Sequence, residues 1–129
     1  MKKYFVLMTM LAAMYACSNA SSDKKEEKPV VPAAAATISE NPDYQKGLAL
    51  IAKSDCLTCH KVHEKVIGPA YAYVAAKYET TDANISMLAS KVIKGGQGVW
   101  GAIPMTPHPQ LSEADAQQMV KYILLLRNK

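Results

Sequence analysis

Five consecutive residues near the middle of the chain have the types and spacing that a covalently held haem requires. They are Cys56, Leu57, Thr58, Cys59 and His60, the pattern C-x-x-C-H. Two thiols separated by two residues can add to the two vinyl groups of a haem, and the next imidazole can ligate the iron from one side. Alone, the pattern fits an oxygen-binding protein, a peroxidase or an electron carrier.

An iron that only carries electrons needs a second axial ligand on the far face of the ring. The candidates are Met87, Met105, Met119, His63 and His108. His63 is only three residues from His60 and cannot reach the opposite face. Met119 falls on the apolar stripe of a predicted helix, where core packing is expected, and Met87 falls between stripe positions, as a surface or rim residue.

Met105 is the preferred candidate for this second ligand. It lies between Pro104 and Pro107 in a non-helical segment, far enough beyond His60 to wrap around the ring. His108 remains the alternative and would give a bis-histidine centre. Methionine and histidine together fill both axial positions and raise the reduction potential, so the chemistry expected is outer-sphere electron transfer.

Hydrophobic periodicity predicts four short helices to position these residues, with no convincing strand, and therefore an all-α fold. Asn41 and Pro42 are a cap and a first-turn residue for a helix reaching about residue 53. A second helix covers about 71–78, and a third runs from a cap at Thr80 or Thr81 to Gly95. The last begins after Ser112, in a capping-box variant.

Two features between and within these helices are unusual. Gly47 lies inside the first helix, where glycine costs about 1 kcal/mol relative to alanine, which suggests a close crossing with another helix. Residues 95–110 are rich in Gly and Pro and predict a loop. The loop also carries Val99, Trp100, Ile103 and Met105, so we expect it to lie against a flat apolar surface.

The N-terminus has the pattern of an export signal. Lys2 and Lys3 precede an apolar stretch, residues 4–16, that is too short to span a bilayer. Ala16 and Cys17 then resemble a lipobox, which predicts a lipoprotein signal peptide at 1–16 and a lipidated Cys17. The alternative is an ordinary cleavable signal peptide, with Cys17 lost or left as a free thiol.

The following stretch, residues 17–40, combines a charged run, prolines and alanines, a composition that predicts a disordered tether. The folded domain is then expected at 41–129. The net charge of +4 is mild, and no aromatic residues alternate with Lys or Arg. Nothing therefore points to a nucleic-acid partner.

Four segments together resemble the short bacterial class I monohaem cytochromes c of the c-551/c-552 type. They are residues 56–60, 68–71, 74–78 and 98–105, and the resemblance covers 41–129. It implies a small cytochrome c fold, with four short helices wrapped around one covalently bound haem c. It also implies an electron carrier rather than an enzyme.

The resemblance also assigns roles to individual residues. Cys56 and Cys59 would form the thioether links, and His60 and Met105 would be the axial ligands of the iron. Pro69 would hold the His60 imidazole through its backbone carbonyl. The indole N–H of Trp100 would reach a haem propionate, and Gly47 would meet Tyr122 where the first and last helices cross.

Two positions depart from the family pattern. Ile51 stands where the first helix usually has an aromatic residue. His108 stands where relatives often have Asn close to the methionine sulfur. We expect His108 to alter the reduction potential or to make it depend on pH near neutrality.

Localisation and partners follow from the signal and the resemblance. The expected protein is a monomer tethered by Cys17 at the extracytoplasmic, periplasmic face of a bacterial membrane. Its expected partners are a quinol-oxidising complex and a terminal oxidase or reductase. Five lysines could ring an exposed haem edge and steer an acidic partner, namely Lys53, Lys61, Lys65, Lys91 and Lys94.

Two other uses of the cysteines deserve comparison. A thiol–disulfide oxidoreductase places its C-x-x-C at the start of a helix that follows a strand, whereas here the motif follows a helix. A structural zinc site would use Cys56, Cys59 and His60, but adjacent Cys59 and His60 are awkward ligands for one tetrahedron and no second pair is present.

Overall fold

The computed structural model describes residues 38–128 of the chain. The predicted signal peptide, Cys17 and the predicted tether up to residue 37 lie outside the described residues. Ile38 and Ser39, at the end of that tether, are helical, and Glu40 separates them from Asn41. Within residues 38–128, no helix has the length and apolar character needed to cross a membrane.

The described residues form the four helices that the sequence predicts. These are α2 (Pro42–Lys53), α3 (Tyr71–Lys77), α4 (Asp82–Lys94) and α5 (Glu113–Leu124). Two short 3₁₀ helices, η1 (Asp55–Thr58) and η2 (Leu125–Asn128), follow α2 and α5 directly. The all-α architecture of four short helices expected from the sequence is confirmed.

Local capping chemistry explains where α2, α4 and α5 begin and where α4 ends. The side chains of Asn41, Thr81 and Ser112 accept hydrogen bonds from the backbone N–H groups of Asp43, Asn84 and Asp115. Such caps satisfy N–H groups that have no partner inside the helix. Gly95 ends α4 with a φ of 76°, which glycine adopts without steric cost.

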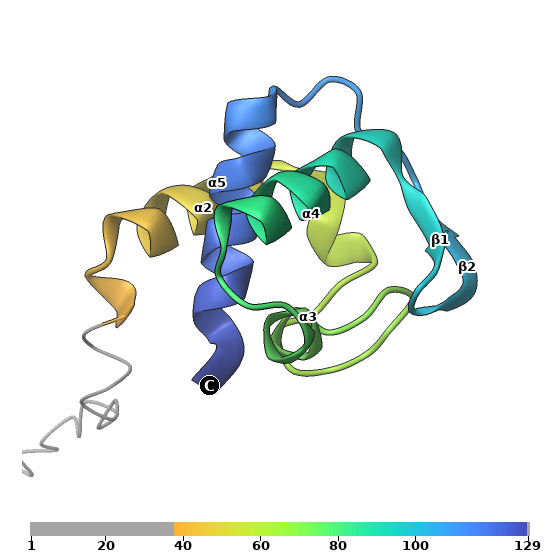
Figure 1. Cartoon of the computed structure of the whole chain (residues 1–129), viewed down its shortest axis with the longest axis horizontal. Coiled ribbons are helices and arrows are strands. Elements are labelled where there is room, and N and C mark those ends of the chain that lie inside the picture. The colour runs from red at the N-terminus through yellow and green to blue at the C-terminus, as the bar shows by residue number, and fades with distance from the viewer. Residues whose placement is uncertain (1–37, 129) are drawn as a thin grey trace, which may run out of the picture. The chain divides into compact units, whose positions relative to one another are not determined.

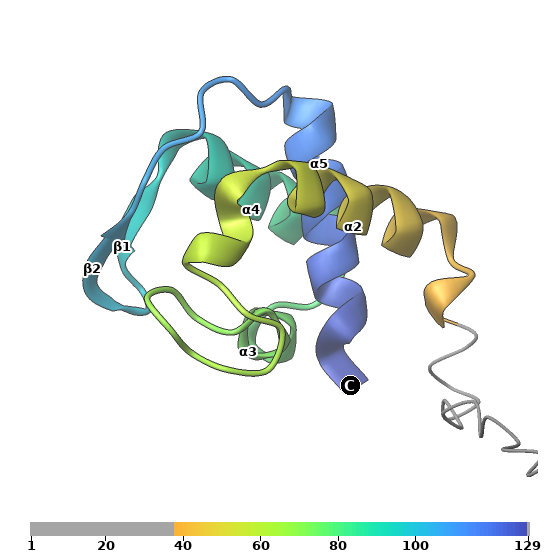
Figure 2. The same ribbon diagram turned by 180° about the vertical axis from the view of Figure 1, so that it is seen from behind.

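Helix α5 is the central element of the domain, and it crosses α2 and packs against α3 and α4 (Figures 1 and 2). The crossing with α2 depends on Gly47. A Cβ atom at this position would overlap Tyr122 Cβ and lie 2.5 Å from the Gln118 carbonyl oxygen. The predicted close crossing, and its Tyr122 partner, are therefore confirmed.

Apolar side chains pack on two sides of α5. One cluster joins α5 to α2 and α3 and includes Ile51, Tyr71 and Met119. The other joins α5 to α4 and includes Ile85, Ala89 and Val120. Because α5 is covered on both sides, its buried residues occupy more than a single stripe.

The expectation of no strand was wrong. Residues 96–105 form an antiparallel hairpin of β1 (Gly96–Gly98) and β2 (Gly101–Met105), with Val99 and Trp100 at the turn. Gly98 and Gly101 flank that turn with φ values of 95° and 125°. A three-residue strand of Gly, Gln and Gly carries no apolar alternation, so period-two patterning could not reveal it.

Candidate haem-binding site

A cavity of about 490 Å³ lies between the C-x-x-C-H segment, the hairpin and α5. Cys56, Cys59 and His60 line it from η1 and the residues just after η1. Trp100 and Met105 line it from the hairpin segment. Nine further aliphatic side chains line the wall, namely Ile51, Ile67, Val74, Leu88, Val92, Val99, Ile103, Val120 and Ile123.

The His60 imidazole is oriented by the backbone. Its Nδ1 lies 2.8 Å from the carbonyl oxygen of Pro69. Because a carbonyl oxygen can only accept, Nδ1 carries the hydrogen and Nε2 keeps its lone pair. The hydrogen bond implied by the family resemblance is therefore present, and it leaves Nε2 able to ligate a metal.

Gly68 and Tyr71 also contact His60, and the sequence did not identify either role. A Cβ atom at residue 68 would overlap His60 Cε1 and lie 2.8 Å from each ring nitrogen. Tyr71 stacks on the imidazole, with 5.3 Å between ring centroids and 17° between planes. Apolar periodicity places Tyr71 in a buried helix stripe but does not indicate which ring it contacts. The Gly68-Pro69 pair is the available sequence signal that the backbone approaches another group closely here.

The two cysteines of the motif are half-buried and are not joined in a disulfide. Burial first, and the adjacent Asp55 second, raise the pKa of the Cys56 thiol. Nucleophilic redox cysteines need the opposite shift, towards the thiolate. The electrostatics of this segment therefore do not suit a thiol–disulfide oxidoreductase.

Four of the five candidates for the second axial ligand line the cavity. Met105, at the end of β2, is half-buried there. Met119 is 2% exposed within the core and Met87 is half-buried on α4, as their positions in the sequence predicted. His108 is buried at the cavity wall, whereas His63 is exposed and does not line it.

Trp100 lines the cavity from the hairpin turn. The Lys77 ammonium lies 5.8 Å from the centre of the Trp100 ring and the same distance from that of Tyr78. An ammonium near an aromatic face gains cation–π attraction. Lys77 therefore places a positive charge beside the indole.

The model of the cytochrome c family matches residues 44–127 of the chain. The chain belongs to the cytochrome c family. The match includes the C-x-x-C-H segment and the hairpin, which together form two walls of the cavity.

Individual cytochromes c are similar over the same region. Cytochrome c-552 of Nitrosomonas europaea is 45% identical over 78 residues, which are 60% of this chain and 76% of that protein. Cytochrome c-551 of Allochromatium vinosum is 42% identical over 83 residues, which are 64% of this chain and 88% of that protein. The crystal structure of the Nitrosomonas europaea protein superposes with a TM-score of 0.57 and covers 61% of this chain and 98% of that one.

These similarities make this cytochrome c a haem-based electron carrier rather than an enzyme, with haem c as its cofactor. The cavity fits that group on chemical grounds. It offers two thiols, an imidazole with its Nε2 lone pair available, a thioether and an aliphatic wall. Within residues 38–128, no three His, Cys, Asp or Glu side chains gather as they would around a bare metal ion.

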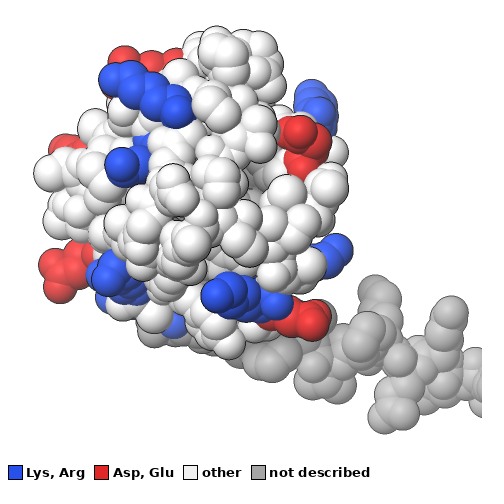
Figure 3. All heavy atoms as spheres, turned by 90° about the vertical axis from the view of Figure 1, so that its right-hand side faces the viewer, with Lys and Arg blue, Asp and Glu red and all other residues white. Residues whose placement is uncertain are grey.

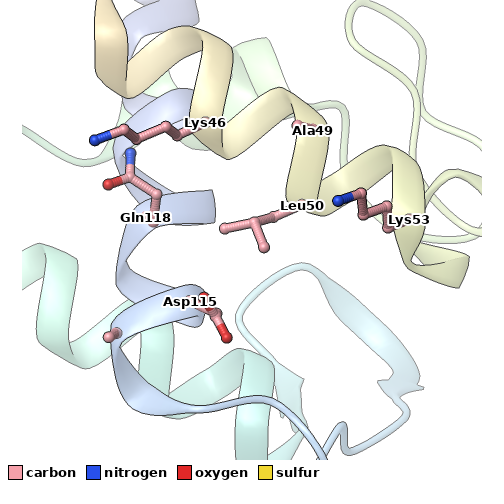
Figure 4. Close-up of a pocket in the computed structure, with 7 residues that line it drawn as sticks. Lys46, Ala49, Leu50, Lys53, Asp115 and Gln118 are labelled. Carbon is pink, nitrogen blue, oxygen red and sulfur yellow. The ribbon is translucent and has the colours of Figure 1, made fainter.

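The predicted ring of lysines is only partly present. Lys65 and Lys91 line the cavity, but Lys53, Lys61 and Lys94 do not. Lys53 lies at a separate open hollow of about 440 Å³ between α2 and α5, which Lys46, Leu50, Asp115 and Gln118 also line (Figure 4). On the hairpin side, charged side chains lie around a broad uncharged centre (Figure 3).

Proposed function

We propose that Cys56 and Cys59 bind haem c as thioethers and that His60 and Met105 are its axial iron ligands. The haem supplies an iron that changes charge by one electron. The protein supplies the rest: it fills both axial positions, shields the ring with aliphatic side chains and presents Trp100 to a propionate. Pro69 fixes the imidazole of His60.

The observation that carries this proposal is the His60–Pro69 hydrogen bond. It fixes the tautomer and the plane of the ring, so Nε2 is the nitrogen available to the iron. An imidazole held in advance does not need to reorient when the iron changes oxidation state. That is the property expected of an axial ligand in an electron carrier.

Met105 is favoured over His108 as the second ligand because of its backbone. It pairs with Gly96 across the hairpin, and its carbonyl oxygen would be only 2.6 Å from a Cβ atom at Gly95. The backbone of Met105 is thus packed closely against Gly95 at the end of α4. His108 Nδ1 already faces Asp55 at 3.5 Å.

Replacing Met105 tests the ligand set. We expect Met105→Ala to lose the long-wavelength absorption band of the ferric iron–thioether bond and to lower the midpoint potential, because the thioether favours Fe(II). His108→Asn should keep the band. If His108→Asn loses the band and Met105→Ala keeps it, the ligand assignment is wrong.

We further propose that the protein is exported and lipidated at Cys17, on the periplasmic face of a bacterial membrane. As a tethered monomer it would accept electrons from a quinol-oxidising complex and deliver them to a terminal oxidase or reductase, without contact to nucleic acid. A tether raises the effective concentration of partners on the same membrane. In cells grown with a labelled fatty acid, the label should appear on the native chain but not on the Cys17→Ser variant. Equal labelling of both chains would contradict lipidation.

A further inference from the structure

We propose that Asp55 and His108 form a clasp that positions the Met105 segment against the haem-attachment segment. The proposal rests on the proposed function, because it takes Met105 as an iron ligand. The clasp consists of the Asp55 carboxylate and the His108 imidazole. No part of it belongs to the C-x-x-C-H pattern or to the family motif around Trp100.

The two side chains meet across the cavity wall. Asp55 Oδ1 lies 3.5 Å from His108 Nδ1, and both residues line the cavity. Asp55 immediately precedes Cys56 in η1, and His108 follows Met105 by three residues. One contact therefore links the segment holding the thiols to the segment holding the thioether.

His108 is the fixed half of this pair. Its backbone N–H donates to the carbonyl oxygens of Val92 and Ile93 at the end of α4, at 3.2 and 3.1 Å. Its own carbonyl oxygen accepts from the Leu111 N–H at 3.1 Å. The imidazole is 11% exposed, whereas the Asp55 side chain is 74% exposed.

A tie at this point matters because the hairpin has few other attachments. Among the described elements, β1 and β2 pack extensively only on each other. Beyond its tight base at Gly95, the hairpin that carries Met105 is therefore held weakly by tertiary packing, and stability varies locally in such regions. A contact three residues beyond Met105 limits how far this strand end can open.

The strength of the clasp depends on charge. A protonated His108 attracts the Asp55 carboxylate, and a neutral imidazole attracts it much less. The other charged side chains that line the cavity are Lys65 and Lys91, the latter from α4. The hairpin contributes no charged side chain, so Asp55 is the acidic group that faces His108.

Displacement of Met105 by added imidazole measures the opening directly. In the haem-loaded full chain, the rate of imidazole binding to ferric iron should rise roughly two- to fivefold in Asp55→Asn and in His108→Asn, the size of an ion pair with an exposed partner. The double variant should exceed neither single variant. Asp55→Glu, which keeps the carboxylate, should restore a rate close to the native one.

The charge state of His108 separates a clasp from general loosening. The native rate should be lower with His108 protonated than with His108 neutral, and the Asp55→Asn rate should be the same in both states. Glu64→Gln is the matched control, since it removes one exposed negative charge from the neighbouring segment, and its rate should stay native.

Three results would overturn the clasp. They are additive effects in the double variant, a native rate in Asp55→Asn, and an equal increase in Glu64→Gln. A native ferric protein without the iron–thioether band would refute the proposed ligation and the clasp together. A native band with unaffected variants would refute the clasp alone.

Discussion

At the scale of single residues, His60 is held on three sides by groups from the segment that follows it. Pro69 accepts its Nδ1–H, Tyr71 stacks on its ring and Gly68 leaves room for the ring. Gly68 and Pro69 act through the backbone. Gly68 matters because the absence of a Cβ leaves room for the imidazole, and Pro69 matters because its carbonyl oxygen accepts the hydrogen bond. The imidazole is positioned by close approach of the chain as much as by hydrogen bonding.

Gly68→Ala tests that close approach. The new methyl group would overlap the imidazole, so the ring must move or the loop must shift, and overpacking of this kind costs about 1–3 kcal/mol. We expect a lower thermal midpoint and a changed midpoint potential in the haem-loaded protein. Thermal unfolding and potentiometry measure the two effects.

Gly96→Ala is the control for this substitution. A Cβ atom there would meet only the flexible Lys91 side chain, at 3.2 Å from its Cδ. Both properties should remain near native in this variant. Equal effects in the Gly68→Ala and Gly96→Ala variants would contradict the interpretation that Gly68 provides space for the His60 ring.

The residue types at the site were predictable to different degrees. Cys56, Cys59 and His60 are contiguous, and their chemistry requires that spacing, so the motif alone identified them. Tyr71 and Asp55 were not identified, because their contacts with His60 and His108 join segments that local patterns treat separately. Apolar periodicity explains why Tyr71 is buried but not which ring it covers.

At the scale of elements, three of the four α-helices were predictable from the capping residues at their N-termini, whereas α3 has no side-chain cap. Asn41, Thr81 and Ser112 each bond to a backbone N–H two or three residues later. The hairpin was not predictable in this way, since its first strand has only Gly and Gln. Its pairing depends on Gly98 and Gly101, whose positive φ values become evident only in the folded chain.

Gly47→Ala tests the crossing of α2 and α5. Alanine favours the helix by about 1 kcal/mol, yet its Cβ would overlap Tyr122 and force the helices apart. We expect net destabilisation of roughly 1–3 kcal/mol, the usual cost of overpacking. Denaturant unfolding of the haem-loaded protein provides the measurement.

Ala52→Gly, at an exposed position of the same helix, calibrates intrinsic propensity. This substitution should lower the free energy of unfolding by about 1 kcal/mol, the effect that helix propensity alone predicts. A stabilised Gly47→Ala variant would mean that propensity outweighs the crossing, contrary to our interpretation.

At the scale of the whole molecule, the domain of about 90 residues is small for its task. Its two apolar clusters lie on either side of α5, and a cavity of about 490 Å³ lies beside them. Three large apolar side chains that line that cavity, Ile67, Val99 and Ile103, are exposed in the protein alone. Haem c therefore completes the hydrophobic core as well as supplying the iron.

Removal of the haem should consequently remove cooperative folding. We expect a Cys56→Ser, Cys59→Ser double variant, made without haem attachment, to lose most of its helical circular dichroism and its sharp thermal transition, as small domains with incomplete cores do. A Cys17→Ser variant, matured normally, controls for cysteine loss and should melt like the native chain. A sharp transition in the haem-free protein would contradict this role for the cofactor.

The crossing of α2 and α5 also determines when the domain can fold during synthesis. α2 leads directly into the C-x-x-C-H segment, but its packing partner α5 is synthesised after α3 and α4. Until α5 is synthesised, α2 lacks its main packing partner, and the domain around the two thiols cannot close. Closure of the domain therefore waits for the synthesis of α5, which leaves time for attachment of the haem.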